Sequence, residues 1–251
     1  MSDELGTLLA DLGAEQLETQ TLLARLPGDD WFRATPAKAW DVRDTVAHLA
    51  DTDEIAVDTC EGGTRPLNDF AAQLASAEDA TLWGVLRGRR QTGAEVLAWW
   101  EDASATERDV LERLDPSVRV PWGLGMRPPS FVTARLMETW AHGLDIRTAL
   151  GARTPDTDRI RHVAWLGTRA LPYAFSVAGR ERPEGELRVE LTLPSGARWT
   201  FGPAGAPNRI TGSASEYCRL FVQRLALADA PSLRGDGDGA VAALEVARAF
   251  L

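Results

Sequence analysis

The sequence predicts an α+β protein in which an N-terminal four-helix bundle is followed by a smaller domain built around a β-hairpin. Three observations support this prediction. Apolar residues recur at helical spacing through most of the first 150 residues. Gly151 is placed to end the last long helix, and from Leu187 apolar and polar residues alternate strictly. We therefore expect two domains, residues 1–151 and residues 152–251.

The helices of the first domain are delimited by capping and breaking residues. The first is expected over Leu5–Leu26, where Pro27 and Gly28 stop it. Asp41 is a good N-cap for a second helix that runs to about Cys60. Further helices are expected over residues 67–76, 80–114 and 130–150, with a break in the long segment near Gly93 or near Ala103 and Ser104.

The second domain begins with a helix from Pro155 to about Leu171 and then changes period. The alternating segment 187–193 is followed by a Pro-Ser-Gly turn and by Arg198–Phe201, which is typical of a β-hairpin. The remaining elements are expected as a strand around residues 209–211, a helix capped by Ser213 through Leu227, a turn over residues 235–239 and a helix over residues 240–250.

Two of the three histidines in the chain, together with one glutamate, indicate a divalent-metal site. Glu138 and His142 are four residues apart, so they lie on one face of a helix, and His48 lies on the second predicted helix. Two imidazoles and one carboxylate suit Zn²⁺, Fe²⁺ or Ni²⁺. Three protein ligands leave coordination positions open, which favours a catalytic site over a closed structural one. A surface or ordinary core role for each histidine is the alternative.

The helical wheel of residues 130–150 favours the metal. Arg135, Glu138, His142 and Asp145 fall within an arc of roughly 80°, and apolar residues border this arc. Ionisable side chains that point into a bundle core need partners, because burial of an unpaired charge is costly. A metal ion is a suitable partner.

Composition narrows the function further. The formal charge is −10 and there is no basic cluster, so we expect neither nucleic acid nor an anionic membrane as the main partner. The start of the chain lacks the pattern of a signal peptide, and no apolar run is long enough for a membrane span, so we expect a cytoplasmic protein. It should act on a small molecule as a monomer or homodimer. Cys60 and Cys218 are expected to be packed free thiols rather than nucleophiles.

Two motifs resemble those of the DinB-like superfamily, and specifically its mycothiol-dependent maleylpyruvate isomerase group. They are residues 40–49 (WDVRDTVAHL) and residues 135–146 (RLMETWAHGLDI). The C-terminal segments ITGSASEYCRLFVQRL at 210–225 and LRGDGD at 233–238 extend the likeness over nearly the whole chain. The resemblance implies a DinB-like four-helix bundle with a C-terminal α+β domain.

The resemblance also implies roles for individual residues. His48, Glu138 and His142 match the metal triad, with Zn²⁺ as the first expectation. Arg135 and Asp145 match flanking polar positions, which would orient the ligands. An arginine of the C-terminal domain reaches the active site in the isomerase, and the matching residue is Arg224 or, one turn earlier, Arg219. The family pattern has a glycine before this arginine, where this chain has Gln223.

Three functions follow as hypotheses. The first, implied by the resemblance, is isomerisation or S-transfer on a small anionic or electrophilic metabolite with mycothiol as the thiol, because ligation to a divalent cation deprotonates a thiol. The second is thiol-independent metal-dependent hydrolase, lyase or isomerase chemistry. The third is a non-catalytic metal-binding or ligand-binding protein. For the enzymes, we expect the C-terminal domain to cover the open side of the metal and present Arg224 or Arg219 to the substrate.

Overall fold

The computed structural model describes all residues except 1, 64–81, 116, 123–124, 154 and 250–251. The chain divides into two compact units, which we call unit 1 (Met1–Arg153) and unit 2 (Thr154–Leu251). Unit 1 is helical and unit 2 combines helices with a four-stranded sheet. The predicted α+β class, with a helical bundle before an α+β part, is confirmed.

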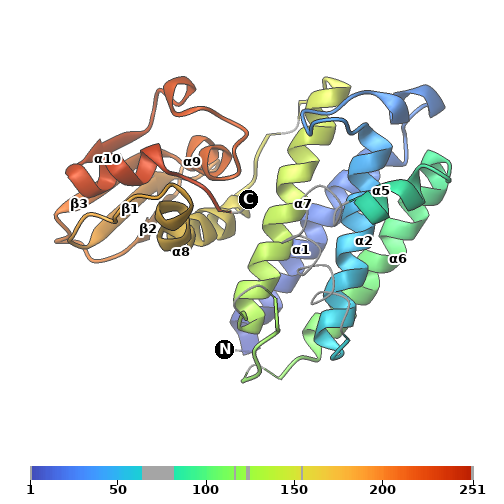
Figure 1. Ribbon diagram of the computed structural model, residues 1–251, viewed down its shortest axis with the longest axis horizontal. Coiled ribbons are helices and arrows are strands. Elements are labelled where there is room, and N and C mark those ends of the chain that lie inside the picture. The colour runs from blue at the N-terminus through green and yellow to red at the C-terminus, as the bar shows by residue number, and fades with distance from the viewer. Residues whose placement is uncertain (1, 64–81, 116, 123–124, 154, 250–251) are drawn as a thin grey trace. The chain divides into compact units, whose positions relative to one another are not determined.

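Four long helices form the bundle of unit 1 (Figure 1). They are α1 (Ser2–Leu23), α2 (Val42–Cys60), α6 (Gly93–Glu112) and α7 (Pro128–Leu150). Helix α2 packs against α6 and α7, and α1 packs against the same two helices, so the four surround one core. A 3-10 turn η1 (Gly28–Phe32) and a short helix α5 (Leu82–Gly88) both pack against α2.

Caps explain where these helices begin and end. Asp41 and Asp44 form a capping box at the start of α2, and Thr92 with Glu95 forms another at the start of α6. The predicted segment 80–114 is therefore broken at Gly93, as one of the two expected positions, and α6 runs on through Ala103 and Ser104. Helix α7 ends at Gly151, whose φ of 64° is the left-handed conformation of a C-cap. The short helix expected over residues 67–76 lies outside the described residues.

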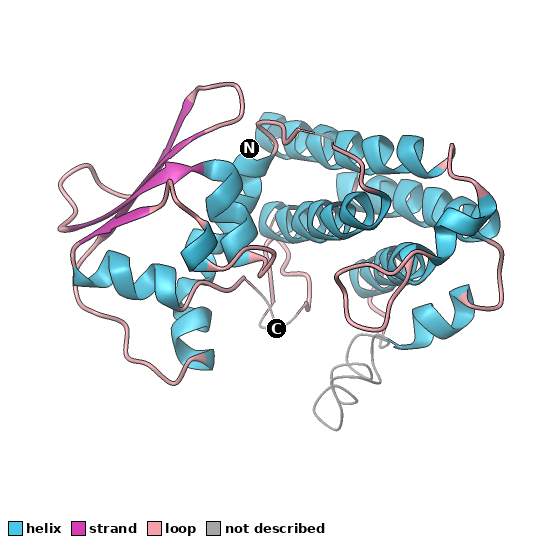
Figure 2. Cartoon of the chain, turned by 90° about the horizontal axis from the view of Figure 1, so that it is seen from above, coloured by secondary structure: helices cyan, strands magenta, loops and turns pink. Residues whose placement is uncertain are grey.

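Unit 2 contains a four-stranded sheet of order β2-β1-β3-β4. The expected hairpin is confirmed as β1 (Leu187–Thr192) paired antiparallel with β2 (Arg198–Phe201). Strand β3 (Asn208–Ser213) lies parallel to β1, and β4 (Arg234–Asp236) pairs antiparallel with β3. The helices of this unit gather to one side of the strands (Figure 2); they are α8 (Ile160–Val177), α9 (Ala214–Phe221), α10 (Asp238–Glu245) and the 3-10 turn η2 (Leu227–Asp229).

Several boundaries in unit 2 were predicted wrongly. Helix α8 begins at Ile160 rather than near Pro155, and α9 ends at Phe221 rather than at Leu227. A turn was expected over residues 235–239, but residues 235 and 236 belong to strand β4, because residues 234–236 pair with β3. The final helix covers Asp238–Glu245 instead of residues 240–250.

Both units bury apolar cores. In unit 1, Leu49, Val96 and Trp100 belong to an apolar cluster to which all four long helices contribute. In unit 2, Val189 of β1 and Ile210 of β3 are buried, and so is Phe221 of α9. Among helices in the described part of the chain, none has the length and apolar character to cross a bilayer.

Candidate metal centre

His48, Glu138 and His142 converge in the core of unit 1. His48 lies on α2, and the other two lie one turn apart on the neighbouring helix α7. Nε2 of His142 is 3.5 Å from a carboxylate oxygen of Glu138, and the two imidazole centroids are 4.8 Å apart. Both histidines are 8% exposed. One ligand atom from each of the three residues lies within 4.8 Å of the other two, which is the only such group of three among the described residues.

The start of α2 is fixed locally, and this places His48. The Asp41 side chain accepts a hydrogen bond from the Asp44 backbone N–H at 2.7 Å, and Asp44 reaches back toward the Asp41 N–H. Arg89 holds the Asp44 carboxylate through Nε at 3.0 Å and Nη2 at 2.7 Å, a bidentate geometry that is specific to arginine. The helix start is therefore held both by the capping box and by Arg89, and His48 lies one turn after it.

Trp40 is a site residue to which the sequence analysis gave no role. Its ring centroid lies 4.9 Å from that of His48 and 6.1 Å from that of His142, so it packs against both imidazoles. The available signal was its position directly before the N-cap Asp41, in the same motif as His48. An aromatic ring at this place excludes water from one side of the two histidines.

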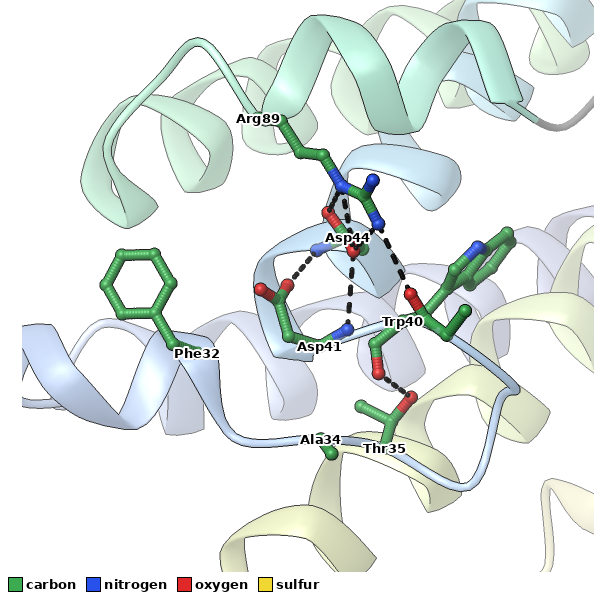
Figure 3. A pocket seen from close by; sticks show the side chains of 8 residues that line it. Phe32, Ala34, Thr35, Trp40, Asp41, Asp44 and Arg89 are labelled. Carbon is green, nitrogen blue, oxygen red and sulfur yellow. Dashed lines mark hydrogen bonds and ion pairs between the residues drawn. The ribbon is translucent and has the colours of Figure 1, made fainter.

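Trp40 also lines an open pocket of about 310 Å³ (Figure 3). It is lined by residues of the loop before α2, the start of α2 and Arg89: Phe32, Ala34, Thr35, Ala39, Trp40, Asp41, Asp44 and Arg89. Of its charged groups, Arg89 binds Asp44, and Arg89 also donates to the Ala39 carbonyl at 3.2 Å. Trp40 is thus shared between this pocket and the histidine pair.

Asp145 lies beside the far nitrogen of His142. Its carboxylate oxygen is 3.3 Å from Nδ1, close enough for an ion pair although not aligned as a hydrogen bond. An acidic group at Nδ1 favours a proton at that nitrogen, so Nε2, which faces Glu138, is the nitrogen that would bind a cation. The geometry agrees with the orienting role expected for Asp145.

Arg135 contacts other groups than the ligand side chains. Its guanidinium donates to Asp53 at 2.5 Å and to Glu107 at 2.8 Å, and to the Thr52 hydroxyl at 3.0 Å. Asp53 and Thr52 belong to α2 and Glu107 to α6, so Arg135 joins three helices. Any effect of Arg135 on the ligands is therefore indirect. Asp53 and Glu107 were not anticipated from the sequence.

Burial and neighbouring charges set the protonation of the three converging side chains. Burial lowers the pKa of His48 to about 3, with the charges of His142 and Arg135 acting in the same direction. Burial alone would raise the pKa of Glu138, but the hydrogen bond and charge of His142 outweigh it and hold this pKa at about 2. The pKa of His142 is raised despite burial, because Asp145 and Glu138 stabilise its charged form. A neutral imidazole and an ionised carboxylate are therefore available as ligands, and the proton on His142 occupies the place that a cation would take.

The sequence profile of the mycothiol maleylpyruvate isomerase N-terminal domain matches residues 12–147, which include all three converging side chains. The chain belongs to this family. Two relatives, both described as uncharacterized proteins of Mycobacterium tuberculosis (strains CDC 1551 and H37Rv), are 38% identical over 98% of this chain and 95% of their own.

The whole fold has counterparts among solved structures of the mycothiol-dependent maleylpyruvate isomerase. The crystal structure of that enzyme gives a TM-score of 0.58, and the structure of a histidine-to-alanine mutant of it gives 0.59. Each comparison covers 92% of this chain and 92% of the other, at 14% sequence identity. The likeness therefore extends beyond the N-terminal domain to unit 2, and it is a likeness of fold.

The donor set of this family member fits a divalent ion. An ion about 2.1 Å from each donor would bring the donors to roughly 3.5 Å from one another. Nε2 of His142 and the Glu138 carboxylate are already at that separation. The three donors lie within 4.8 Å of one another, so side-chain rotations that bring the His48 donor closer would complete three-point coordination.

The two arginines expected to meet the substrate lie within unit 2. Arg219, at the end of α9, forms an ion pair with Asp156 and also donates to the Ser215 carbonyl. Arg224 lies beyond the end of α9 and donates to the Val222 carbonyl at 2.9 Å. Because α9 ends at Phe221, Arg219 lies on that helix and Arg224 lies beyond it.

Gln223 has a backbone conformation that suits glycine, the residue that the resemblance implies at this position. Its φ is 58°, in the left-handed region that glycine adopts most easily. This chain thus has a left-handed turn at a non-glycine residue, and Arg224 follows it directly.

Neither cysteine is suited to be a nucleophile. Burial raises the pKa of the Cys60 thiol to about 12, and burial also raises the pKa of Cys218 well above its ordinary value. Both are free and at least partly buried, as expected.

Proposed function

We propose that the chain is a divalent-metal-dependent enzyme that uses a mycothiol-type thiol for isomerisation or S-transfer on a small anionic or electrophilic metabolite. The observation that carries the proposal is the convergence of His48, Glu138 and His142 in the domain that defines the family. The thiol and the isomerase chemistry come from the family and from the solved enzyme with the same fold.

Zn²⁺ is the ion we propose first, with Fe²⁺ or Ni²⁺ as alternatives. Two imidazole nitrogens and one carboxylate oxygen are donors that all three ions accept. When bound, such an ion would act as a Lewis acid that lowers the pKa of a coordinated thiol, or of water in a hydrolytic reaction.

The residues around the triad would prepare it for this ion. Burial keeps His48 neutral, so its ring nitrogen offers a lone pair rather than a proton. Asp145 orients His142, and Trp40 shields one side of both imidazoles from water. Weak dielectric screening in a dry site strengthens every charge interaction made there.

We also propose that unit 2 supplies an arginine for the substrate, with Arg224 as the first candidate and Arg219 as its rival. A guanidinium binds a carboxylate through two parallel hydrogen bonds, which both holds and orients an anionic substrate. Arg219 already binds the Asp156 carboxylate in this way, so it would have to exchange one carboxylate for another. Arg224 donates to the Val222 backbone carbonyl at 2.9 Å and matches the position that the resemblance implies for the substrate-binding arginine.

Thiol-independent metal chemistry is the second candidate function, because the same triad would equally serve a hydrolase, lyase or isomerase. Dependence of turnover on a thiol separates it from the first. Ligand binding without any turnover would instead favour a non-catalytic role.

The test combines metal analysis of the purified protein with a titration by a low-molecular-weight thiol. We expect about one divalent ion per chain and, with Co²⁺ as the probe ion, a sulfur-to-metal charge-transfer band that grows as thiol is added. One ion with no thiol-dependent band would support the thiol-independent alternative. A protein purified and reconstituted with Zn²⁺ that retains no ion would refute the proposal.

A further inference from the structure

A second polar layer lies in the bundle core next to the triad. Arg135 of α7 is paired with Asp53 of α2 and with Glu107 of α6, and each of these side chains is at most 2% exposed. The other carboxylate oxygens are also satisfied, since Trp100 Nε1 donates to Asp53 at 3.0 Å and Gln16 Nε2 donates to Glu107 at 3.3 Å. Side chains from all four long helices meet in this cluster.

The helix positions place this cluster one layer along the core from the triad. Arg135 precedes Glu138 by three residues and His142 by seven, so all three lie on one face of α7. Asp53 follows His48 by five residues on α2, which runs antiparallel to α7 (Figure 1). The same two helices therefore meet twice, once through the triad and once through the ion pair.

One hydroxyl links Arg135 to the backbone of a triad residue. Arg135 Nη2 donates to Thr52 Oγ1 at 3.0 Å, and Thr52 Oγ1 donates to the His48 carbonyl at 2.9 Å. Both hydrogen bonds involve Thr52 of α2, so a displacement of Arg135 would also displace the turn of α2 that carries His48.

The charge of the cluster makes its arrangement demanding. Two carboxylates and one guanidinium carry a net charge of −1 if all are ionised, which is costly in a core without solvent. Burial and the charge of Asp53 raise the pKa of Glu107 to about 8, although Arg135 opposes this. With one proton on the carboxyl pair the cluster is neutral. A buried ion cluster of this kind adds little net stability but tolerates few alternative arrangements of its helices.

We propose that Arg135, Asp53 and Glu107 act as positioning residues that fix the register of α2 against α7 and thereby hold His48 at ligating distance from Glu138 and His142. This rests on the proposed function, in which the triad binds a metal. Apolar helix contacts alone permit sliding, and a shift of one turn, about 5.4 Å, exceeds the separation of the donors. Loss of groups that hold metal ligands in place typically lowers metal affinity by 10- to 100-fold.

Helix α7 offers a matched control for Arg135. Arg147 is also a buried arginine on α7, and it pairs with Glu15 and Glu18 of α1. Helix α1 carries none of the three triad residues. Arg135→Met and Arg147→Met therefore remove the same buried group from the same helix, but only the first releases the helix that carries His48.

The experiment measures Zn²⁺ affinity of the full-length variants by competition with a chelator and ligand geometry from the Co²⁺ absorption spectrum. We expect Arg135→Met to lower Zn²⁺ affinity by 10- to 100-fold and to alter the Co²⁺ spectrum. Arg147→Met should lower thermal stability while leaving affinity within about two-fold of wild type. Asp53→Asn, which keeps the side-chain shape, should weaken Zn²⁺ binding in the same direction and serves if Arg135→Met does not fold.

The outcomes separate the two proposals. If wild type binds Zn²⁺ and the Arg135→Met or Asp53→Asn protein binds it equally well, the positioning role is refuted and the metal site stands. An equal loss of affinity in Arg147→Met would also refute it, because the effect would then follow general destabilisation. Wild type that binds no Zn²⁺ overturns both proposals.

Discussion

The two units differ most in what they bury. Unit 1 encloses many buried charged side chains, whereas the described residues of unit 2 include no buried Asp, Glu, Arg, Lys or His. Those of unit 1 are Glu15, Asp44, His48, Asp51, Asp53, Glu107, Arg135, His142, Asp145 and Arg147. Unit 1 has 15 basic and 26 acidic residues, a formal charge of −11, and unit 2 has 12 and 11, a charge of +1.

This difference indicates that unit 1 is the part of the chain in which buried ionisable groups serve a function. Burial of an ionisable group opposes folding unless a partner compensates it, so an apolar core such as that of unit 2 is the economical solution. A bundle of the length of unit 1 has enough apolar residues for a core of that kind. Five of its ten buried ionisable side chains instead belong to the triad or to the adjacent ion cluster, and we interpret both groups as serving the proposed metal.

The largest expected effect compares a histidine from each unit. His142→Ala in unit 1 should abolish stoichiometric metal binding, because two donors cannot hold a divalent ion tightly. His162→Ala, on α8 of unit 2, should leave metal content unchanged. Elemental analysis of both variants after reconstitution with Zn²⁺ decides this. Metal retained by the His142 variant would show that the ion is held elsewhere.

The next prediction tests whether unit 2 supplies a charged side chain for the substrate although its core is apolar. Arg224→Ala should lower turnover or ligand affinity by roughly 10²-fold, the scale of a lost charge-assisted contact, while metal content stays intact. Arg219→Ala is the rival variant. Arg209→Ala, an exposed arginine of β3, is the control. Steady-state kinetics and metal analysis are the measurements, and normal activity in both Arg224 and Arg219 variants would confine the charged site to unit 1.

A third prediction uses two glutamates whose pKa values are shifted in opposite directions. In unit 1, burial and Asp53 raise the pKa of Glu107 to about 8 against the pull of Arg135, and the nearby Cys60 thiol and Gln16 amide are uncharged at neutral pH. Folding therefore takes up a proton, and this stabilisation is complete below about pH 4.5 and lost as the pH rises toward 8. Glu107→Gln should remove a slope of at most about 1.4 kcal/mol per pH unit in the free energy of unfolding.

Glu190 of unit 2 is the counterpart. Its pKa is lowered by the hydrogen bond from Arg188 and by Arg198 and Arg209, so its contribution is present above the ordinary glutamate pKa and lost as the pH falls. Urea unfolding of Glu107→Gln between about pH 4 and pH 8, and of Glu190→Gln from about pH 5 down to pH 2.5, should give pH dependences of opposite sign relative to wild type. The same sign for both would contradict the assignment of Glu107 as a protonated buried acid.

Local signals predicted much of the fold. The capping residue Asp41, the C-cap Gly151 and the alternation from Leu187 each act through neighbouring residues, and the corresponding element ends were predicted to within a few positions. Strand β4 was missed because its three residues contain a glycine and are held in place by pairing with β3, a contact that local sequence does not encode. The early end of α9 depends on the unusual backbone of Gln223.

The candidate site likewise contains residues that local sequence predicts and residues that it does not. Glu138 and His142 form a pair at i and i+4, and the sequence around His48 completes a motif, so their convergence was predictable. The partners of Arg135 were not, because Glu107 is 28 residues away and Asp53 is 82. Nothing in a linear pattern of isolated acidic residues distinguishes a buried partner from a solvated one.

The smallest expected effect concerns the turn that precedes Arg224. Gln223 has a φ of 58°, which costs a residue with a Cβ roughly 1–2 kcal/mol relative to glycine. Its side chain also accepts a hydrogen bond from Arg248 at 3.0 Å, so Gln223→Gly changes two things at once. Gln223→Ala removes the hydrogen bond and keeps the Cβ, and the difference between the two variants isolates the backbone strain. Because glycine also loses more backbone entropy on folding, we expect Gln223→Gly to be more stable than Gln223→Ala by only about 0.5–1 kcal/mol. Urea unfolding measures this difference. An alanine variant as stable as the glycine variant would mean that the left-handed turn relaxes when its side chain is shortened, and Arg224 would then not be held by a rigid turn in unit 2.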